Sequence, residues 1–236
     1  MHNMTNPQGV SRVQASVDEM NGRFKLICQE LDVMVGRQSR FYTNFPKLHG
    51  IAWEEVLSPA GIYLYRPVMV VEAAISDLET YVRQGSLSGP RRHADKLRFI
   101  TSIFDAMNFL HQECDLLHGD LKPANILVFQ NLDTRLLELK LADFGLAYDI
   151  TEHLDPADGR MQGTPYWSAP ETYPNSPSWA VSLHASTQDY YSFGLVLWFI
   201  LFGYPVGDLK NGYNDADEKE FQTPPFKIVQ CSSNNQ

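Results

Sequence analysis

Apolar residues recur at helical spacing in two parts of the chain. In the first, apolar side chains three or four residues apart predict a helix with one buried face, made of Phe24, Ile27, Leu31 and Met34. The second, Lys96–Leu110, is typical of a long amphipathic helix. Its inward-facing residues are expected to be Leu97, Ile100, Ile103, Phe104, Met107 and Leu110.

Two short runs between these segments have the character of β-strands, at Leu48–Trp53 and at Val68–Val71. The second run is continuously apolar and rich in valine, which predicts a strand buried on both faces. A further helix is expected to start within residues 77–82, and short strands and loops are expected from 117 to 146.

One apolar run, from Phe193 to Val206, could be mistaken for a membrane span. It has about 14 residues, fewer than the ~20 that a helix needs to cross a bilayer, and it follows the charged Asp189. A buried helix is therefore favoured over a membrane anchor. The first residues contain no apolar signal core, so we expect a cytoplasmic protein that contacts no membrane.

Composition narrows the choice of partners. The 236 residues carry a net charge of −9, which argues against binding nucleic acid or anionic lipid, because both need clustered Lys and Arg. Cys28, Cys114 and Cys231 are far apart and form no C-x-x-C pair, so neither a disulfide framework nor a zinc site is indicated. Residues 1–23 and 211–236 are polar, and we expect a disordered lead-in and a frayed tail.

Three motifs follow one another in the second half of the chain. They are LHGDLKPANILV from Leu117, KLADFGLAYD from Lys140 and GTPYWSAPE from Gly163, and DYYSFG follows at Asp189. Their order and spacing resemble the protein kinase family, whose signatures include a catalytic loop, D-F-G and A-P-E. The resemblance implies an α+β, protein kinase-like fold. Residues 24–72 would form a partial small lobe with helix C and strands, and residues 73–210 a mostly helical large lobe that ends early.

The resemblance assigns chemistry to four residues. Asp120 would accept the proton of the incoming hydroxyl, and Lys122 would sit beside the transferred phosphate, as in the serine/threonine-specific branch. Asn125 and Asp143 would hold Mg²⁺ through oxygen ligands. The implied reaction is ATP-dependent phosphoryl transfer to a protein hydroxyl.

Other positions take supporting roles by the same resemblance. The nucleotide would meet Glu72, Ala74, Asp77 and Leu127, with the adenine edge at the backbone of residues 72–74 and the ribose at Asp77. Structural or regulatory roles would fall to Glu30, His118, Phe144, Gly145, Thr164, Glu171 and Asp189. Of these, His118 and Phe144 are expected to pack between the lobes, and Thr164 to line the pocket of the substrate residue.

Gly119 stands where many kinases carry an arginine that binds a phosphate on the activation loop. Phosphorylation of the loop is therefore expected to matter little, although Thr151 and Thr164 offer hydroxyls. His111 and Asp115 are interpreted as surface residues at a helix end.

Two family features have no counterpart in the sequence. No glycine triad and no V-A-I-K-like strand precede Glu30, which resembles the helix-C glutamate that pairs with the strand lysine. Arg12 is a poor substitute, because its flanking residues do not suit a strand. Glu171 also lacks its usual arginine partner, which would lie beyond the last residue. A kinase truncated in both lobes is expected, with weak or no activity.

Two other functions remain open. A pseudokinase could act as a binding module or scaffold, and exposed apolar surface could lead to self-association or to binding by a chaperone. The string HGDL also occurs in small-molecule phosphotransferases of the same fold. Those enzymes tend to have His in place of Lys122 and no A-P-E segment, so a protein substrate is favoured.

Overall fold

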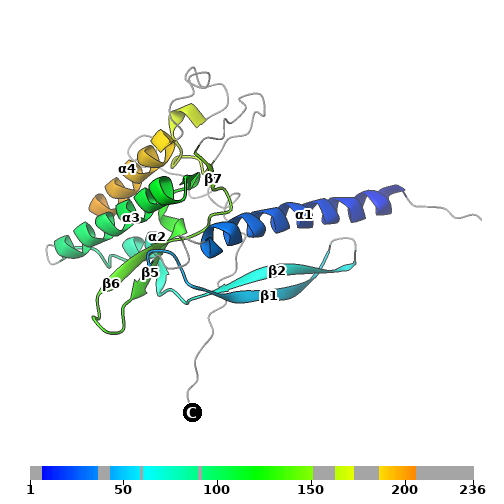
Figure 1. The fold of residues 1–236 in the computed structure, drawn as a ribbon, viewed down its shortest axis with the longest axis horizontal. Coiled ribbons are helices and arrows are strands. Elements are labelled where there is room, and N and C mark those ends of the chain that lie inside the picture. Colours follow the sequence, from blue (N-terminus) through cyan, green and yellow to red (C-terminus); the bar gives the residue numbers. More distant parts are fainter. Residues whose placement is uncertain are drawn as a thin grey trace, which may run out of the picture.

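The computed structural model describes residues 7–36, 43–58, 61–89, 92–150, 163–172 and 186–205. These residues form four α-helices and short antiparallel sheets, which confirms the α+β class (Figure 1). The expected tail, residues 211–236, lies outside the described residues. The boundary between the lobes at residue 72 stays a prediction.

The first helix, α1, spans Pro7–Val35 and packs against β2 (Figure 1). It buries Ile27, Val33 and Met34, but Phe24 is 49% exposed, so the expected burial of Phe24 is wrong. The helix begins at Pro7 and not at Phe24, so the expectation that residues 1–23 are disordered is wrong for residues 7–23. No proline lies between Pro7 and the end of α1 at Val35, so a helix nucleated by the packed turns can continue toward the N-terminus.

A hairpin follows α1. Its strands, β1 (Leu48–Leu57) and β2 (Tyr63–Val71), pair antiparallel, with Leu57 opposite Tyr63 and an irregularity between Leu48 and Gly50. Residues 68–71 are only partly buried, so the expected burial on both faces is wrong. The physical reason is that, within the described residues, this sheet has only two strands, and the face that carries Ile51 and Trp53 is exposed.

Small elements connect the hairpin to the catalytic segments. A three-stranded sheet has the order β3-β5-β6, with β3 at Ser76–Asp77, β5 at Ile126–Gln130 and β6 at Leu137–Leu141. The other elements are helix α2 (Leu78–Arg83), strands β4 (Leu116–Leu117) and β7 (Tyr148–Asp149), and 3₁₀ turns at Pro123–Asn125 and Pro170–Thr172. Strands β4 and β7 pair with each other and bring the two ends of this region together.

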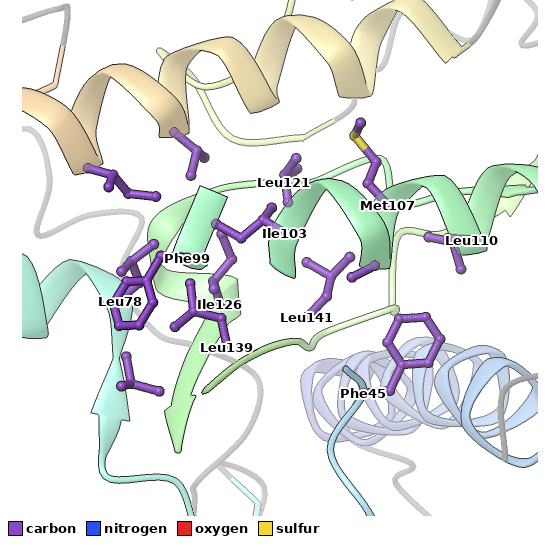
Figure 2. Close-up of a cluster of buried hydrophobic side chains, with 14 of the residues drawn as sticks. Phe45, Leu78, Phe99, Ile103, Met107, Leu110, Leu121, Ile126, Leu139 and Leu141 are labelled. Carbon is purple, nitrogen blue, oxygen red and sulfur yellow. The ribbon is translucent and has the colours of Figure 1, made fainter. Parts of the chain in front are cut away.

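Helix α3 (His93–Glu113) supplies much of the core, as Figure 2 shows. Its fully buried side chains include Phe99, Ile103, Met107 and Leu110. The expected burial of two other positions is wrong, because Leu97 is 66% and Phe104 43% exposed.

Helix α4 (Ser186–Phe202) packs against α3 (Figure 1). Val196, Phe199 and Ile200 are at most 1% exposed, as expected for a core helix, whereas Phe202 at its end is 52% exposed. Within the described residues, no helix combines the length and apolar character needed to cross a membrane.

Candidate active site

The catalytic loop runs from β4 to β5 through the 3₁₀ turn Pro123–Asn125. The amide of Asn125 donates to the Lys122 carbonyl at 3.0 Å, and the amide of Ala142 donates to the Asn125 carbonyl at 2.9 Å. These bonds tie the loop to the segment that follows β6. The side chains of the loop are therefore held by backbone on both sides.

Asp120 lies at the centre of the site and is 7% exposed. Its Oδ2 contacts Lys122 Nζ at 2.8 Å and accepts a hydrogen bond from Asn125 Nδ2 at 3.1 Å, while its Oδ1 accepts one from Thr164 Oγ1 at 2.6 Å. Lys122 Nζ also donates to Thr164 Oγ1 at 2.6 Å. The structure thus brings together four residues that the sequence proposed for this site.

Asp143 occupies a left-handed backbone conformation, with φ of 64°. Burial raises the pKa of its carboxyl, nearby His118 and Lys122 act to lower it, and Asp120 acts to raise it. Asn125 uses Nδ2 for bonds to Asp120, so its Oδ1 is the amide atom that could bind a cation. Oxygen donors of this kind fit a hard ion such as Mg²⁺.

Asp189, in the first turn of α4, hydrogen-bonds the backbone of the catalytic loop. Its Oδ2 accepts a hydrogen bond from the amide of His118 at 2.7 Å, and its Oδ1 accepts one from the amide of Gly119 at 3.1 Å. His111 Nε2 lies 2.8 Å from Asp189 Oδ2. Burial would raise the pKa of Asp189, but the hydrogen bond from His111 and the influence of His118 outweigh it, and the pKa is lowered.

The contact with Asp189 corrects the interpretation of His111 as a surface residue. His111 is 2% exposed, and its ring meets Tyr190 edge to face. It lies four residues after Met107 on the buried face of α3, so its place in the apolar periodicity was a signal that could have identified it.

His118 and Phe144 pack in the core as expected, with both side chains fully buried and ring centroids 5.5 Å apart. His118 Nε2 lies 3.0 Å from the Ala142 carbonyl, which can only accept, so Nε2 donates. The amide of Asp120 approaches His118 Nδ1 at 3.3 Å, as suits an unprotonated Nδ1. The ring thereby links the catalytic loop to the segment containing Asp143.

Gly119 has a φ of +76°, and a Cβ atom there would lie 2.5 Å from the Leu146 carbonyl oxygen and 3.2 Å from the Tyr148 ring. Backbone cannot yield as a flexible side chain can. In this conformation the position accommodates glycine and no larger residue. Thr151, the other hydroxyl considered in the activation loop, lies outside the described residues.

The expected nucleotide contacts lie around β3 and β5. Leu127, 7% exposed, is paired in register with Asp77, whose Oδ1 accepts a hydrogen bond from the Thr80 amide at 2.8 Å and so caps α2. Glu72 Oε1 accepts from the Lys47 amide at 2.8 Å and pairs with Lys140. Among the described residues, Ala74 makes no hydrogen bond outside regular secondary structure. The roles of these four residues in nucleotide binding stay predictions.

Comparison of the sequence with known proteins identifies the family. A family model described as the protein kinase domain matches residues 56–235. This chain belongs to the protein kinase family. Similar proteins include a dual specificity protein kinase, shkD, of Dictyostelium discoideum (40% identical over 133 residues, 56% of this chain and 16% of the relative).

Two further relatives are kinases by name. The human receptor-interacting serine/threonine-protein kinase 3 is 38% identical over 135 residues, 53% of this chain and 24% of its own length. The mitogen-activated protein kinase MKC1 of Candida albicans is 32% identical over 174 residues, 72% of this chain and 31% of its own length. The kinase chain thus spans less than a third of the length of each of these three relatives.

Glu30 lies before the residues that the family model matches, and an acidic group is near its side chain. Glu30 on α1 is 5% exposed, and its Oε2 has no hydrogen-bond partner among the described residues. Burial, followed by the nearby Asp143 carboxylate, raises the pKa of Glu30 from 4.5 to about 8. No lysine partner for Glu30 is present in the described residues, and the side chain of Arg12 is not among those described.

Two further residues singled out in the sequence are Gly145, which follows Asp143 by two residues, and Glu171, which lies before α4. A Cβ atom added to Gly145 would meet Asp143 Oδ1 at 3.4 Å and Leu26 Cβ at 3.7 Å, so α1 closely approaches the segment after Asp143. Glu171 lies in the 3₁₀ turn Pro170–Thr172, and its side chain is not among those described.

Proposed function

We propose that this chain is a serine/threonine protein kinase domain that uses ATP and Mg²⁺ to phosphorylate a protein hydroxyl, with weak activity. The observation that carries the proposal is the contact of the Thr164 hydroxyl with Asp120 at 2.6 Å and with Lys122 at 2.6 Å. An aliphatic hydroxyl therefore fits between the proton acceptor and the cation. A substrate serine or threonine that replaced Thr164 there would be poised for deprotonation.

The residues divide the work of phosphoryl transfer. Asp120 holds the hydroxyl proton, and Lys122 places a positive charge beside it. Asn125 orients the Asp120 carboxylate through its Nδ2, and together with Asp143 it would hold the metal ion. When bound, the ion would neutralise charge on the triphosphate.

The surroundings of Glu30 are the reason for proposing weak activity. Among the described residues no lysine pairs with the Glu30 carboxyl, whose pKa burial raises to about 8, so the lysine–glutamate pair that would position the nucleotide lacks its lysine there. We therefore expect weak binding of Mg²⁺-ATP and slow turnover. Protein substrates are proposed because the family and the named relatives are protein kinases.

Incorporation of labelled phosphate from ATP into mixed serine and threonine peptides tests the proposal. The chain should transfer phosphate slowly in the presence of Mg²⁺, and Asp120→Asn should reduce the rate by at least ~100-fold, because the amide cannot accept the proton. Asp105→Asn, on the exposed side of α3, is the matched control and should leave the rate unchanged. Equal rates for the chain and for Asp120→Asn would refute the assignment of Asp120.

A binding module is the second candidate, and the β1–β2 hairpin favours it. Five large side chains on one face of the hairpin are at least 50% exposed: Ile51, Trp53, Leu57, Tyr63 and Tyr65. Retained peptide binding without any phosphate transfer would favour this function over catalysis. A small-molecule phosphotransferase has less support, because the family match is to the protein kinase domain.

A further inference from the structure

Two acidic residues from different elements lie close enough to influence each other electrostatically. Glu30 comes from α1, and Asp143 comes from the segment after β6. Asp143 is the strongest charged influence on the Glu30 carboxyl, and the backbone amides of Phe144 and Asp143 also hydrogen-bond toward it. The Glu30 carboxyl is therefore directed at the Asp143 segment.

One oxygen of these two carboxyls lacks a hydrogen-bond partner among the described residues. Glu30 Oε2 is fully buried and has no hydrogen-bond partner among the described residues, although the side chain is only 5% exposed. A buried polar atom without a partner costs about 1–3 kcal/mol, so such an atom in a folded protein needs an explanation. A ligand that binds this oxygen would remove the cost.

The charges around the pair indicate which ligand is needed. The pKa of Asp143 is raised chiefly by burial; nearby His118 and Lys122 act to lower it, and the acidic Asp120 acts to raise it. Lys122 is already bonded to Asp120 and Thr164. Lys25, on the same helix as Glu30, is exposed to solvent. The described residues thus supply two carboxyls and no cation dedicated to Glu30.

We propose that Glu30 and Asp143 together bind a hard divalent cation, Mg²⁺ or Mn²⁺, in the absence of nucleotide, with Asn125 Oδ1 as a further oxygen donor. In this chain α1 then contributes directly to the metal site. Within the described residues, no three of His, Cys, Asp and Glu form a metal cluster. An ion held there would keep several of its waters, as Mg²⁺ commonly does when one or two carboxylates hold it.

Titration of the full chain with Mn²⁺, followed by electron paramagnetic resonance without nucleotide, tests this site. Glu30→Gln and Asp143→Asn should each weaken Mn²⁺ binding by about tenfold or more, since even outer-sphere partners of metal ligands change affinity by 10–100-fold. Asp105→Asn, which removes an exposed carboxylate from α3, should bind Mn²⁺ like the unmodified chain.

Two results of the Mn²⁺ titration would overturn the proposed cation site. Loss of binding in Asp143→Asn but unchanged binding in Glu30→Gln would overturn the proposal, because the ion would then not need α1. Absence of Mn²⁺ binding to the unmodified chain would overturn it as well. The amide of glutamine has nearly the same shape as a protonated carboxyl, so Glu30→Gln is expected to fold, and its thermal unfolding checks this.

A second measurement needs no variant. In the chain labelled with ¹³C at glutamate carboxyls, small amounts of Mn²⁺ should broaden the Glu30 carboxyl signal before that of Glu113, which is exposed at the far end of α3. Simultaneous broadening of both signals would contradict a site at Glu30. Neither measurement uses kinase activity, so failure of the proposed function would not affect the result.

Discussion

Glu30 is a single residue whose protonation links folding to pH. Its folded pKa of about 8 lies above the ordinary value of 4.5, so between these pH values the folded chain holds a proton that the unfolded chain has released. Stability is therefore full below about pH 4.5 and falls as the pH rises toward 8, by about 1.4 kcal/mol per pH unit at most.

Glu30→Gln should remove this dependence. In EDTA, the variant should be more stable than the unmodified chain at pH 8, by on the order of 4 kcal/mol, and nearly equal to it at pH 4.5. Urea unfolding at the two pH values measures the difference. A parallel pH dependence in both proteins would show that Glu30 is ionised in the folded state.

Gly119 is a second single residue with a large expected effect, because the conformation of the catalytic loop at this position requires glycine. Gly119→Ala should destabilise the chain by more than ~2 kcal/mol, because a left-handed conformation costs a side-chain-bearing residue about 1–2 kcal/mol and the new Cβ would overlap the Leu146 oxygen. Gly194→Ala is the matched control. Gly194 lies in α4 with open space around its Cβ position, and alanine there should stabilise by up to ~1 kcal/mol. Equal effects in urea unfolding would contradict the steric argument.

At the scale of elements, α4 holds the catalytic loop through one carboxylate. Asp189→Asn replaces an oxygen acceptor with an NH₂ group that faces backbone amides, so we expect a loss of about 3 kcal/mol at pH 7. The folded pKa of Asp189 is lowered, so its contribution is present at neutral pH and is lost as the pH falls through that value.

The difference between Asp189→Asn and the unmodified chain should accordingly shrink in acid. Urea unfolding at pH 7 and at pH 3 provides the test. Asp105→Asn, on the exposed side of α3, should show no such difference at either pH. A cost for Asp189→Asn that stays constant with pH would mean that its charge does not stabilise the loop.

At the scale of the whole molecule, exposed apolar surface is expected to cause association. The hairpin face containing Trp53, Tyr63 and Tyr65 is exposed, and patches beyond a few hundred Å² favour self-association or binding by a chaperone. Trp53→Lys should shift the sedimentation distribution toward monomer, since Trp53 is 63% exposed and its replacement removes little folded-state packing. Leu132→Lys, at another exposed site, should change the distribution less. A monomeric unmodified chain would contradict the prediction.

The sequence determined the identity of the site and the class of fold. Helical periodicity located α3, because it reports which residues a neighbour must cover, and a continuous apolar run indicated α4. The expected strands at 48–53 and 68–71 cover only part of β1 and β2. The motifs placed Asp120, Lys122, Asn125 and Thr164 in one site, and the structure brings these residues within hydrogen-bonding distance of one another. Their chemistry depends on residue type and order, which are properties of the chain itself.

Tertiary structure decided which side chains lose contact with water. It buried His111 against Asp189, exposed Leu97 and Phe104, and left Glu30 in the core with no charged partner among the described residues. Burial depends on the contacts made by elements far apart in the sequence, as when α1 meets the segment after β6. A pKa follows from those contacts and from the residual solvent around the group, so no local pattern could have given the protonation state of Glu30.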